Sequence, residues 1–496
     1  MIKFKLVGKN KIDKINTCKL IIINGKKIIG DVSYENEKKI FSILKNNIID
    51  KNKKKMLFVN FNKKKYEFYY FLILYTKKFN FILDYEYEEI IRNFFSEIKN
   101  KNFSEIIFNI LKIKVKRKNT FWKIKRAIEI INDENYEFNY FKKSKKNLTK
   151  RISFMVEYKN INYLNKSKFY GIYVSYGIEK AKNLANMPSN ICNSKYIKKK
   201  LLNLKKKSKK LKIEFIDYKK MLLNKMNAYL SVNSGSSNPP IMSVIKYYGC
   251  NKNLKPIIII GKGVTFDSGG LSLKNQTNMI DMKYDMSGAA SIYGIIKSLI
   301  KLSLPINVIG IIACAENSID GKSSRPGDVV KSMSGKTIEI VNTDAEGRLI
   351  LCDVLTYVEK FNPKFVINIA TLTGSCIFAL GKYFTGLMSN CNLLSKKLID
   401  ASIQSSDYIW RLPIRRNMIK SLYSNIADIS NVSSNNEAGA IIAGCFLSCF
   451  AKKYKWAHLD IAGTANLKIN NKTYSSGRPV SLMIQFLINI SNERNK

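Results

Sequence analysis

The sequence predicts an α/β protein with two domains, of which the larger, C-terminal one has a mostly parallel central sheet flanked by helices. Three observations carry this prediction. The chain has 496 residues, which is more than one ordinary hydrophobic core organises. From about residue 166 onward, apolar runs of strand length alternate with longer helical segments. Before that point the pattern is irregular and interrupted by tracts of lysine and asparagine.

The N-terminal domain, residues 1–165, is predicted to be a smaller α/β unit. Strand-like pieces occupy residues 19–25, 54–61 and 70–76, and residues 87–100 have the spacing of a helix. Lysine-rich stretches join these pieces, and none of them carries a motif that we can match. The role of this domain is therefore open, and the chemistry is expected in the rest of the chain.

The C-terminal domain, residues 166–496, has the pattern of a sheet covered on both faces. Two segments between its apolar runs, 287–302 and 347–361, have helical length and spacing. Strands that alternate with helices form parallel sheets, whose sites lie at the carboxyl ends of the strands. Five runs are predicted to be buried strands: 256–261, 306–314, 336–342, 364–372 and 456–463.

The net charge of +48 raises the question of a nucleic-acid partner, because neutralisation of phosphates dominates such affinity. Lysine, asparagine and isoleucine are all over-used together, as A/T-rich codons would produce, and this raises basicity without any partner. We favour the compositional explanation. The alternative is a nucleic-acid-binding regulator that uses the basic N-terminal domain.

The sequence predicts a cytoplasmic protein with no membrane partner. In the first 25 residues lysine or asparagine interrupts every apolar run, so no signal-peptide core forms. The longest apolar runs are far shorter than the roughly 20 residues that span a bilayer. The nine cysteines are an odd number without paired metal spacing, which is typical of free thiols in a reducing compartment.

Three familiar kinds of site are excluded. The glycines of segment 261–263 resemble a dinucleotide fingerprint, but Phe266 stands where its third glycine is required. Segment 335–337 resembles the end of a phosphate-binding loop, but Val330 replaces the necessary glycine. The single histidine, His458, lies in an apolar strand pattern and is predicted to be a hydrogen-bonded core residue rather than a catalytic base.

Charged residues gather where the predicted strands end, in segments 261–274, 279–290 and 341–350. Such charges are costly to bury unless they are paired or coordinated. Four carboxylates converging there would repel one another, and two divalent cations would reverse that repulsion. The residues that require compensation are Lys262, Asp267, Lys274, Asp285, Asp344, Glu346 and Arg348.

The acidic segment 342–349 has its charges at alternate positions. Asp344, Glu346 and Arg348 are each two residues apart, so an extended backbone would point all three side chains to the same side. Gly347 would let the backbone approach an anion closely, and Arg348 could then bind that anion with two hydrogen bonds.

Segment 342–349, NTDAEGRL, resembles the signature of the M17 leucyl aminopeptidase family, the cytosol aminopeptidases. The segments GKGVTFDSGG, MKYDMSGAA, RPGDVV, LCDVLTYVE, ATLTG, WRLP, AGCFL, WAHLDIAGTA and GRP are similar to that family too. The resemblance extends over residues 183–487, about three-fifths of the chain. Asn275 departs from the family pattern, where a proline is usual, and this position touches no expected ligand.

The resemblance implies two divalent metal ions per subunit. One would be bound by Asp267, Asp344 and Glu346, with Asp344 also offering its main-chain carbonyl. The second would be bound by Lys262, Asp267, Asp285 and Glu346. A lysine ligand must be neutral, and an adjacent dication favours loss of its proton. Oxygen ligands with one amine suit Mn²⁺ or Zn²⁺, with Mg²⁺ as a further candidate.

The resemblance also implies a reaction and its catalytic residues. N-terminal residues, preferably Leu or other apolar ones, would be hydrolysed from peptides by water that two metal ions activate. Protonated Lys274 would stabilise the oxyanion, and Arg348 would hold a bicarbonate that accepts a proton. The subunits would form a homohexamer. The substrate side chain would bind Met282, Thr371, Gly374, Ala462 and Ala465.

Overall fold

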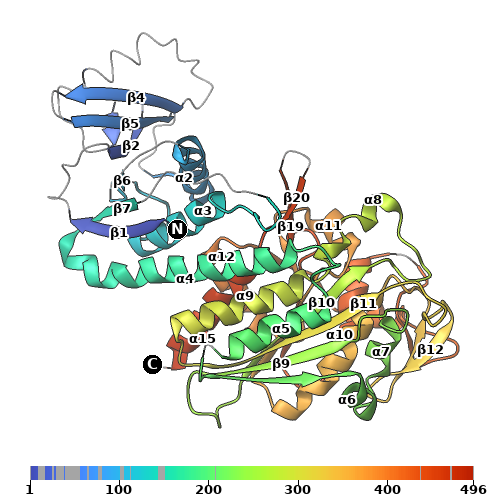
Figure 1. Ribbon diagram of the computed structural model, residues 1–496. Coiled ribbons are helices and arrows are strands. Elements are labelled where there is room, and N and C mark those ends of the chain that lie inside the picture. Colours follow the sequence, from blue (N-terminus) through green and yellow to red (C-terminus); the bar gives the residue numbers. More distant parts are fainter. Residues whose placement is uncertain are drawn as a thin grey trace. The chain divides into compact units, whose positions relative to one another are not determined.

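The structure is a computed structural model that contains two compact units, Met1–Ser175 and Tyr176–Lys496. Each unit has its own large sheet (Figure 1). The helix α4, Ile161–Ala185, contains the boundary between them. The structure describes residues 2–8, 17–24, 27–29, 38, 56–63, 66–75, 81–100, 105–111, 113–142, 151–206, 208–435, 437–469 and 472–494.

The first unit is built on a sheet whose described strands follow the order β1-β7-β6-β2-β5-β4, with β3 paired to β2. The helices α2, Asp84–Ile98, and α3, Thr120–Glu134, contribute to its apolar core. Strands and a helix form at all four predicted places, as β2, β4, β5 and α2. The strands are β1 Lys3–Gly8, β2 Thr17–Asn24, β3 Lys27–Ile29, β4 Met56–Lys63, β5 Tyr66–Tyr75, β6 Glu105–Phe108 and β7 Arg151–Val156.

The second unit is built on a sheet whose described strands follow the order β16-β15-β18-β14-β10-β11-β9-β8. Its centre, from β18 to β11, is parallel, whereas β9 and β15 run antiparallel to these strands. This confirms the predicted α/β class. The strands are β8 Leu211–Ile216, β9 Ile241–Tyr248, β10 Ile257–Asp267, β11 Asn307–Asn317, β14 Phe365–Ala370, β15 Thr385–Ser389, β16 Ile409–Arg411 and β18 Trp456–Asp460.

Helices cover both faces of this central sheet (Figure 1). On one face, α10, Glu346–Tyr357, packs with alternate residues of β10 such as Ile258 and Ile260 in one apolar core. On the other face, α9, Ser287–Leu302, approaches β10 at Gly261, where a Cβ would lie 2.5 Å from the carbonyl oxygen of Gly288. Strand alternation therefore decides which helix each β10 residue meets.

Shorter elements complete the second unit and hold α10 in place. Asp353 of α10 is fully buried and accepts hydrogen bonds from the backbone N–H groups of Tyr229 at 2.9 Å and Met333 at 2.7 Å. The remaining helices are α5 Ser194–Lys205, α6 Tyr218–Leu223, α7 Asn227–Val232, α8 Gln276–Met279, α11 Gly374–Leu380, α12 Asn392–Ser405, α13 Arg416–Lys420, α14 Gly439–Ser448 and α15 Val480–Arg494.

One predicted strand lies outside the central sheet. Segment 336–342 forms β13, Thr337–Ile340, which pairs with β12, Asp328–Lys331, and β17, Ile429–Ser430, in a small sheet. The prediction that this segment lies beside the other four strands in the central sheet was wrong. The strand is only half-buried, in an alternating pattern, because it does not lie between two helical layers.

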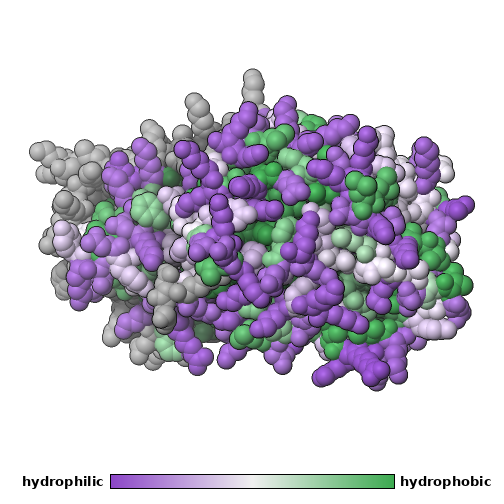
Figure 2. Space-filling view, turned by 90° about the horizontal axis from the view of Figure 1, so that it is seen from below, coloured by the Kyte–Doolittle hydropathy of each residue, from purple (hydrophilic) through white to green (hydrophobic). Residues whose placement is uncertain are grey.

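Hydrophilic side chains cover most of the molecular face seen in Figure 2, and hydrophobic ones appear between them in separate patches. Among the described helices, none combines the length and the apolar character needed to cross a membrane. The eight cysteines from Cys192 to Cys449 are free thiols.

Candidate active site

A cavity of about 660 Å³ opens at the carboxyl end of the central strands, within the second unit. It brings together ten of the twelve residues that the sequence singled out. Arg348 and Ala465 are buried and do not line it. The ten that do are Lys262, Asp267, Lys274, Met282, Asp285, Asp344, Glu346, Thr371, Gly374 and Ala462.

A bulge in β10 allows two of these side chains to reach the same cavity. Lys262 and Asp267 are five residues apart, so in a regular strand they would point to opposite faces. The register against β11 shifts between Val264 and Asp267, where three steps along β10 match two steps along β11. The extra residue reverses the alternation, so both charged groups line the cavity.

Lys262 joins two of the carboxylates at the buried end of the cavity. Its Nζ lies 2.8 Å from Asp285 Oδ1 and 2.6 Å from Glu346 Oε1, and donates to the carbonyl oxygen of Thr371 at 3.0 Å. Burial lowers the pKa of Lys262, but the negative charges of Asp285, Glu346 and Asp267 outweigh it and hold the pKa above its ordinary value. In this arrangement Lys262 is an ammonium group.

Lys274 joins the other two carboxylates of the cluster, Asp267 and Asp344. Its Nζ lies 2.9 Å from Asp267 Oδ2 and forms an ion pair with Asp344. Burial opposes the charge of Lys274, yet the carboxylates of Asp267, Glu346 and Asp344 raise its pKa above the ordinary value. The side chain is 14 % exposed, so this ammonium group reaches the cavity in protonated form.

Two carboxyl groups of the cluster, Asp285 and Asp344, resist ionisation. Burial, reinforced by the charges of Glu346 and Asp267, raises the pKa of Asp285 well above its usual range, against the pull of Lys262. Burial and the charge of Asp267 raise the pKa of Asp344 to about 6. Such shifts are the signature of a site that is short of positive charge.

The donor set of this cluster fits divalent cations. One oxygen each from Asp267, Asp344 and Glu346 lies within 4.8 Å of the others. Asp285 Oδ2 is buried and has no hydrogen-bond partner among the described residues, although Thr371 Oγ1 donates to the other oxygen at 2.8 Å. Carboxylate oxygens left unpaired in a buried site suit Mn²⁺, Mg²⁺ or Zn²⁺.

The acidic segment is a turn followed by a helix, so the prediction of an extended backbone there was wrong. The N–H of Asp344 donates to Asn342 Oδ1 at 2.8 Å, and the N–H of Ala345 donates to the carbonyl oxygen of Asn342 at 3.2 Å. These bonds close the turn before α10 begins at Glu346. Asp344 and Glu346 still meet because the turn reverses the chain.

Arg348 is buried and lies outside the lining of the cavity. Its Nη1 donates to the carbonyl oxygen of Asn431 at 2.6 Å, and its Nε is buried without a hydrogen-bond partner among the described residues. Burial lowers the pKa of Arg348 to about 10, against the charges of Glu346 and Asp460. The guanidinium therefore remains positively charged at neutral pH.

His458 is a structural residue, as predicted. It is fully buried, and its Nδ1 lies 2.7 Å from Nδ2 of Asn368, whose Oδ1 accepts from Trp456 Nε1 at 2.7 Å. Because Asn368 uses its oxygen for Trp456, its amide group donates to His458. Burial lowers the pKa of His458 to about 3, so the ring is neutral and takes no part in the cavity.

Gly347 is needed for the approach of Lys262. A Cβ at this position would lie 2.8 Å from both Cε and Nζ of Lys262 and 2.9 Å from Cδ1 of Leu372. The lysine is already fixed by two carboxylates, so it could not move aside without breaking an ion pair.

Two positioning residues were not singled out from the sequence. Asn317 donates to Asp267, and Asp460 accepts from the N–H groups of Leu372 at 3.2 Å and Ala462 at 3.1 Å, and from Thr373 Oγ1 at 2.8 Å. Each residue stands at the carboxyl end of a central strand, β11 or β18. That position is the signal that could have identified them.

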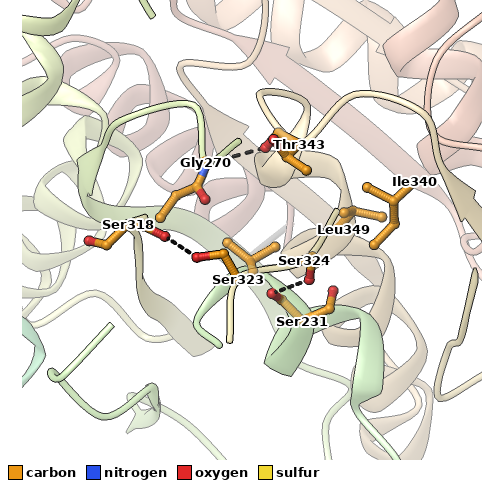
Figure 3. A pocket seen from close by; sticks show the side chains of 10 residues that line it. Ser231, Gly270, Ser318, Ser323, Ser324, Ile340, Thr343 and Leu349 are labelled. Atoms are coloured by element: carbon orange, nitrogen blue, oxygen red, sulfur yellow. Dashed lines mark hydrogen bonds between the residues drawn. The ribbon is translucent and has the colours of Figure 1, made fainter. Parts of the chain in front are cut away.

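A second, small pocket has Thr343 among its lining residues (Figure 3), together with Asn317. Its volume of about 10 Å³ is near the minimum for one water molecule. Serine hydroxyls close it, since Ser323 donates to the carbonyl oxygen of Ser318 at 2.8 Å and Ser324 to that of Ser231 at 2.7 Å. This pocket shares no lining residue with the large cavity and is too small for a substrate.

Known proteins match most of the chain. The model of the cytosol aminopeptidase family, catalytic domain, matches residues 179–484. The probable cytosol aminopeptidase of Wigglesworthia glossinidia brevipalpis is 47% identical over 474 residues, 94% of either chain. The cytosol aminopeptidase of Haemophilus influenzae strain Rd is 45% identical over 405 residues, 82% of either chain. This protein therefore belongs to the cytosol aminopeptidase family and is a metal-dependent aminopeptidase, a hydrolase that acts on peptides.

Proposed function

We propose that this protein releases Leu and other apolar residues from the N-terminus of peptides, by hydrolysis at a site with two metal ions. The observation that carries the proposal is the cluster of buried Asp267, Asp285 and Glu346 with half-buried Asp344, which lines a cavity of peptide-binding size. One ion would be held by Asp267, Asp344 and Glu346, with the main-chain carbonyl of Asp344. The second would be held by Lys262, Asp267, Asp285 and Glu346.

When bound, two divalent cations lower the pKa of a water molecule and polarise the scissile carbonyl group. The chain supplies the remaining functions. Lys274 is protonated and reaches the cavity, so its ammonium group is suited to stabilise the negative charge that develops on the carbonyl oxygen. The free amino group of the peptide would bind at the second ion, beside Asp285. This requirement for a free terminus restricts cleavage to the first residue.

Arg348 is proposed to hold a bicarbonate that supplies a proton acceptor. Its Nε is buried, positively charged and without a partner among the described residues, which suits an anion. The lining residues Met282, Thr371, Gly374 and Ala462 are proposed to surround the substrate side chain, and Ala465 to support them from behind. Small residues at 374 and 462 leave room for a group the size of Leu.

We further propose that the protein is a cytoplasmic homohexamer that uses Mn²⁺ or Zn²⁺ in the cell. Light scattering of the purified full chain checks the assembly, and a monomer at assay concentration would contradict it. An anomalous diffraction map recorded at the Mn and Zn absorption edges locates and identifies the ions.

The activity test is hydrolysis of Leu-amide and of a Leu-initiated peptide by the purified protein with Mn²⁺ or Zn²⁺. Release of Leu is expected, together with no cleavage of the same peptide carrying an acetylated amino terminus. A chelator should abolish turnover, and added metal should restore it. Equal cleavage of the acetylated peptide would overturn the exopeptidase assignment.

A further inference from the structure

One wall of the cavity is a polar hairpin. It consists of β19, Asn466–Ile469, and β20, Lys472–Ser475, paired so that Lys468 lies opposite Thr473. Asn466 and Lys468 are two residues apart and therefore share one face of β19. Both of them line the cavity together with Thr473, whereas Leu467 between them does not.

The hairpin is attached to the segment that carries Met282. Thr473 Oγ1 donates to Asp281 Oδ2 at 3.0 Å, and the hydroxyl of Tyr284 donates to the carbonyl oxygen of Thr473 at 2.7 Å. The two residues of this segment that make these bonds, Asp281 and Tyr284, lie on either side of Met282 in the sequence. The polar face of the hairpin thus adjoins the part of the wall that is proposed to contact the first side chain of the substrate.

Asn466 has an unused hydrogen-bonding group in this wall. Its Oδ1 is buried and has no hydrogen-bond partner among the described residues. A buried amide oxygen without a partner costs free energy that a ligand can recover by donating to it. An apolar substrate side chain would leave this cost in place.

We propose that Asn466 determines specificity by pairing with a side-chain carboxamide, so that peptides beginning with Gln are substrates alongside those beginning with apolar residues. This inference rests on the aminopeptidase function proposed above. A carboxamide carries both a donor and an acceptor, and so complements the carboxamide of Asn466 more completely than a hydroxyl or a thioether does.

The charges of the cavity favour a neutral partner. Lys382 and Lys468 line the cavity and disfavour a cationic side chain, and Asp281 lines it and disfavours an anionic one. Gln avoids both penalties. It also matches Met in length and shape, so the two residues differ mainly in their capacity for hydrogen bonding.

The test compares kcat/KM for two dipeptides that differ only in Gln or Met at the first position, with Mn²⁺ present. In the wild-type protein the Gln peptide is expected to be cleaved within about tenfold of the Met peptide. Asn466→Leu keeps the approximate volume and removes the acceptor, so the Gln-to-Met ratio should fall at least tenfold. The ratio is measured within one preparation and does not depend on the fraction of folded enzyme.

Asn278→Leu is the matched control, because Asn278 lines the same cavity but is exposed. Its Gln-to-Met ratio should stay within twofold of the wild-type ratio. The inference is overturned if Asn466→Leu leaves the ratio unchanged, if Asn278→Leu lowers it equally, or if the wild type cleaves the Gln peptide a thousandfold more slowly. Failure to cleave even Leu and Met peptides would instead overturn the proposed function.

Discussion

The side-chain amide of Asn317 lies 2.8 Å from Asp267 Oδ1, and donates also to the carbonyl oxygen of Thr343 at 3.2 Å. It therefore joins the end of β10 to the turn that carries Asp344. Both contacts are buried, and Asn317 itself is 5 % exposed. A neutral side chain outside the cavity lining fixes the spacing of two proposed metal ligands.

Asn317→Leu should weaken metal binding while most of the fold is kept. Loss of an outer partner of a metal ligand typically reduces affinity by 10- to 100-fold, and about that reduction is expected for Mn²⁺. Isothermal titration calorimetry on the metal-depleted protein measures it. Asn253→Leu, at an exposed asparagine, provides the comparison. Unchanged affinity in Asn317→Leu would show that Asp267 is positioned without this amide.

Gly347→Ala should reduce activity. The new methyl group would lie 2.8 Å from Lys262 Nζ and push that side chain out of place. A displacement near 1 Å in an active site can cost about a hundredfold in kcat/KM. Gly321→Ala, where no atom lies within 4 Å of the added Cβ, should behave as the wild type. A fully active Gly347→Ala protein with an unchanged melting temperature would contradict the proposed role of Lys262.

Lys274→Ala should lower kcat by at least about a hundredfold, the usual loss when a donor to an oxyanion is removed. The KM for a Leu peptide should change much less, because the carbonyl oxygen carries little charge before the transition state. Steady-state kinetics separate the two parameters. The exposed Lys322→Ala variant controls for loss of a positive charge. A rise in KM alone would assign Lys274 to ground-state binding.

Asp353 should make stability depend on pH. Burial raises its pKa to about 7, partly offset by hydrogen bonds from the backbone N–H groups of Met333 and Tyr229. An unfolded aspartate titrates near pH 4, so between about pH 4 and 7 the folded state holds the extra proton. The contribution of Asp353 to the free energy of unfolding must then decrease as pH rises through that window, by up to about 4 kcal/mol.

The Asp353→Asn variant isolates this effect because its side chain does not titrate. The difference in unfolding free energy between wild type and variant should be larger at pH 5 than at pH 8, as measured by denaturant unfolding. A difference that is constant, or that grows with pH, would mean that Asp353 is ionised throughout.

The fold class and the gathering of charged residues at the candidate site were accessible from the sequence because they depend on short-range patterns. Unbroken apolar runs such as 256–261 and 364–372 identify strands buried between two helical layers. Polar residues at the ends of such runs meet at one edge of a parallel sheet, which is why Lys262, Asp267 and Thr371 come together.

The features that the sequence did not predict depend on turns and on contacts between polar groups in the folded protein. The alternating charges of 342–349 suggested an extended backbone, but the amide of Asn342 closes a turn and α10 takes over at Glu346. Arg348 is buried beside Asn431 as a result. No sequence pattern predicts that the buried oxygen of Asn466 lacks a hydrogen-bond partner, because this depends on which donors lie near it in the folded protein.

The irregularity in β10 has a consequence for how this strand can vary in length. Regular pairing of every residue between Val264 and Asp267 with β11 would restore the ordinary alternation and turn the aspartate to the face of α9, although every charged residue would still be present. Inserting one residue more would move it along the edge and away from Asn317. Surface connections of the molecule can lengthen or shorten freely, whereas an added residue in this segment displaces a proposed metal ligand.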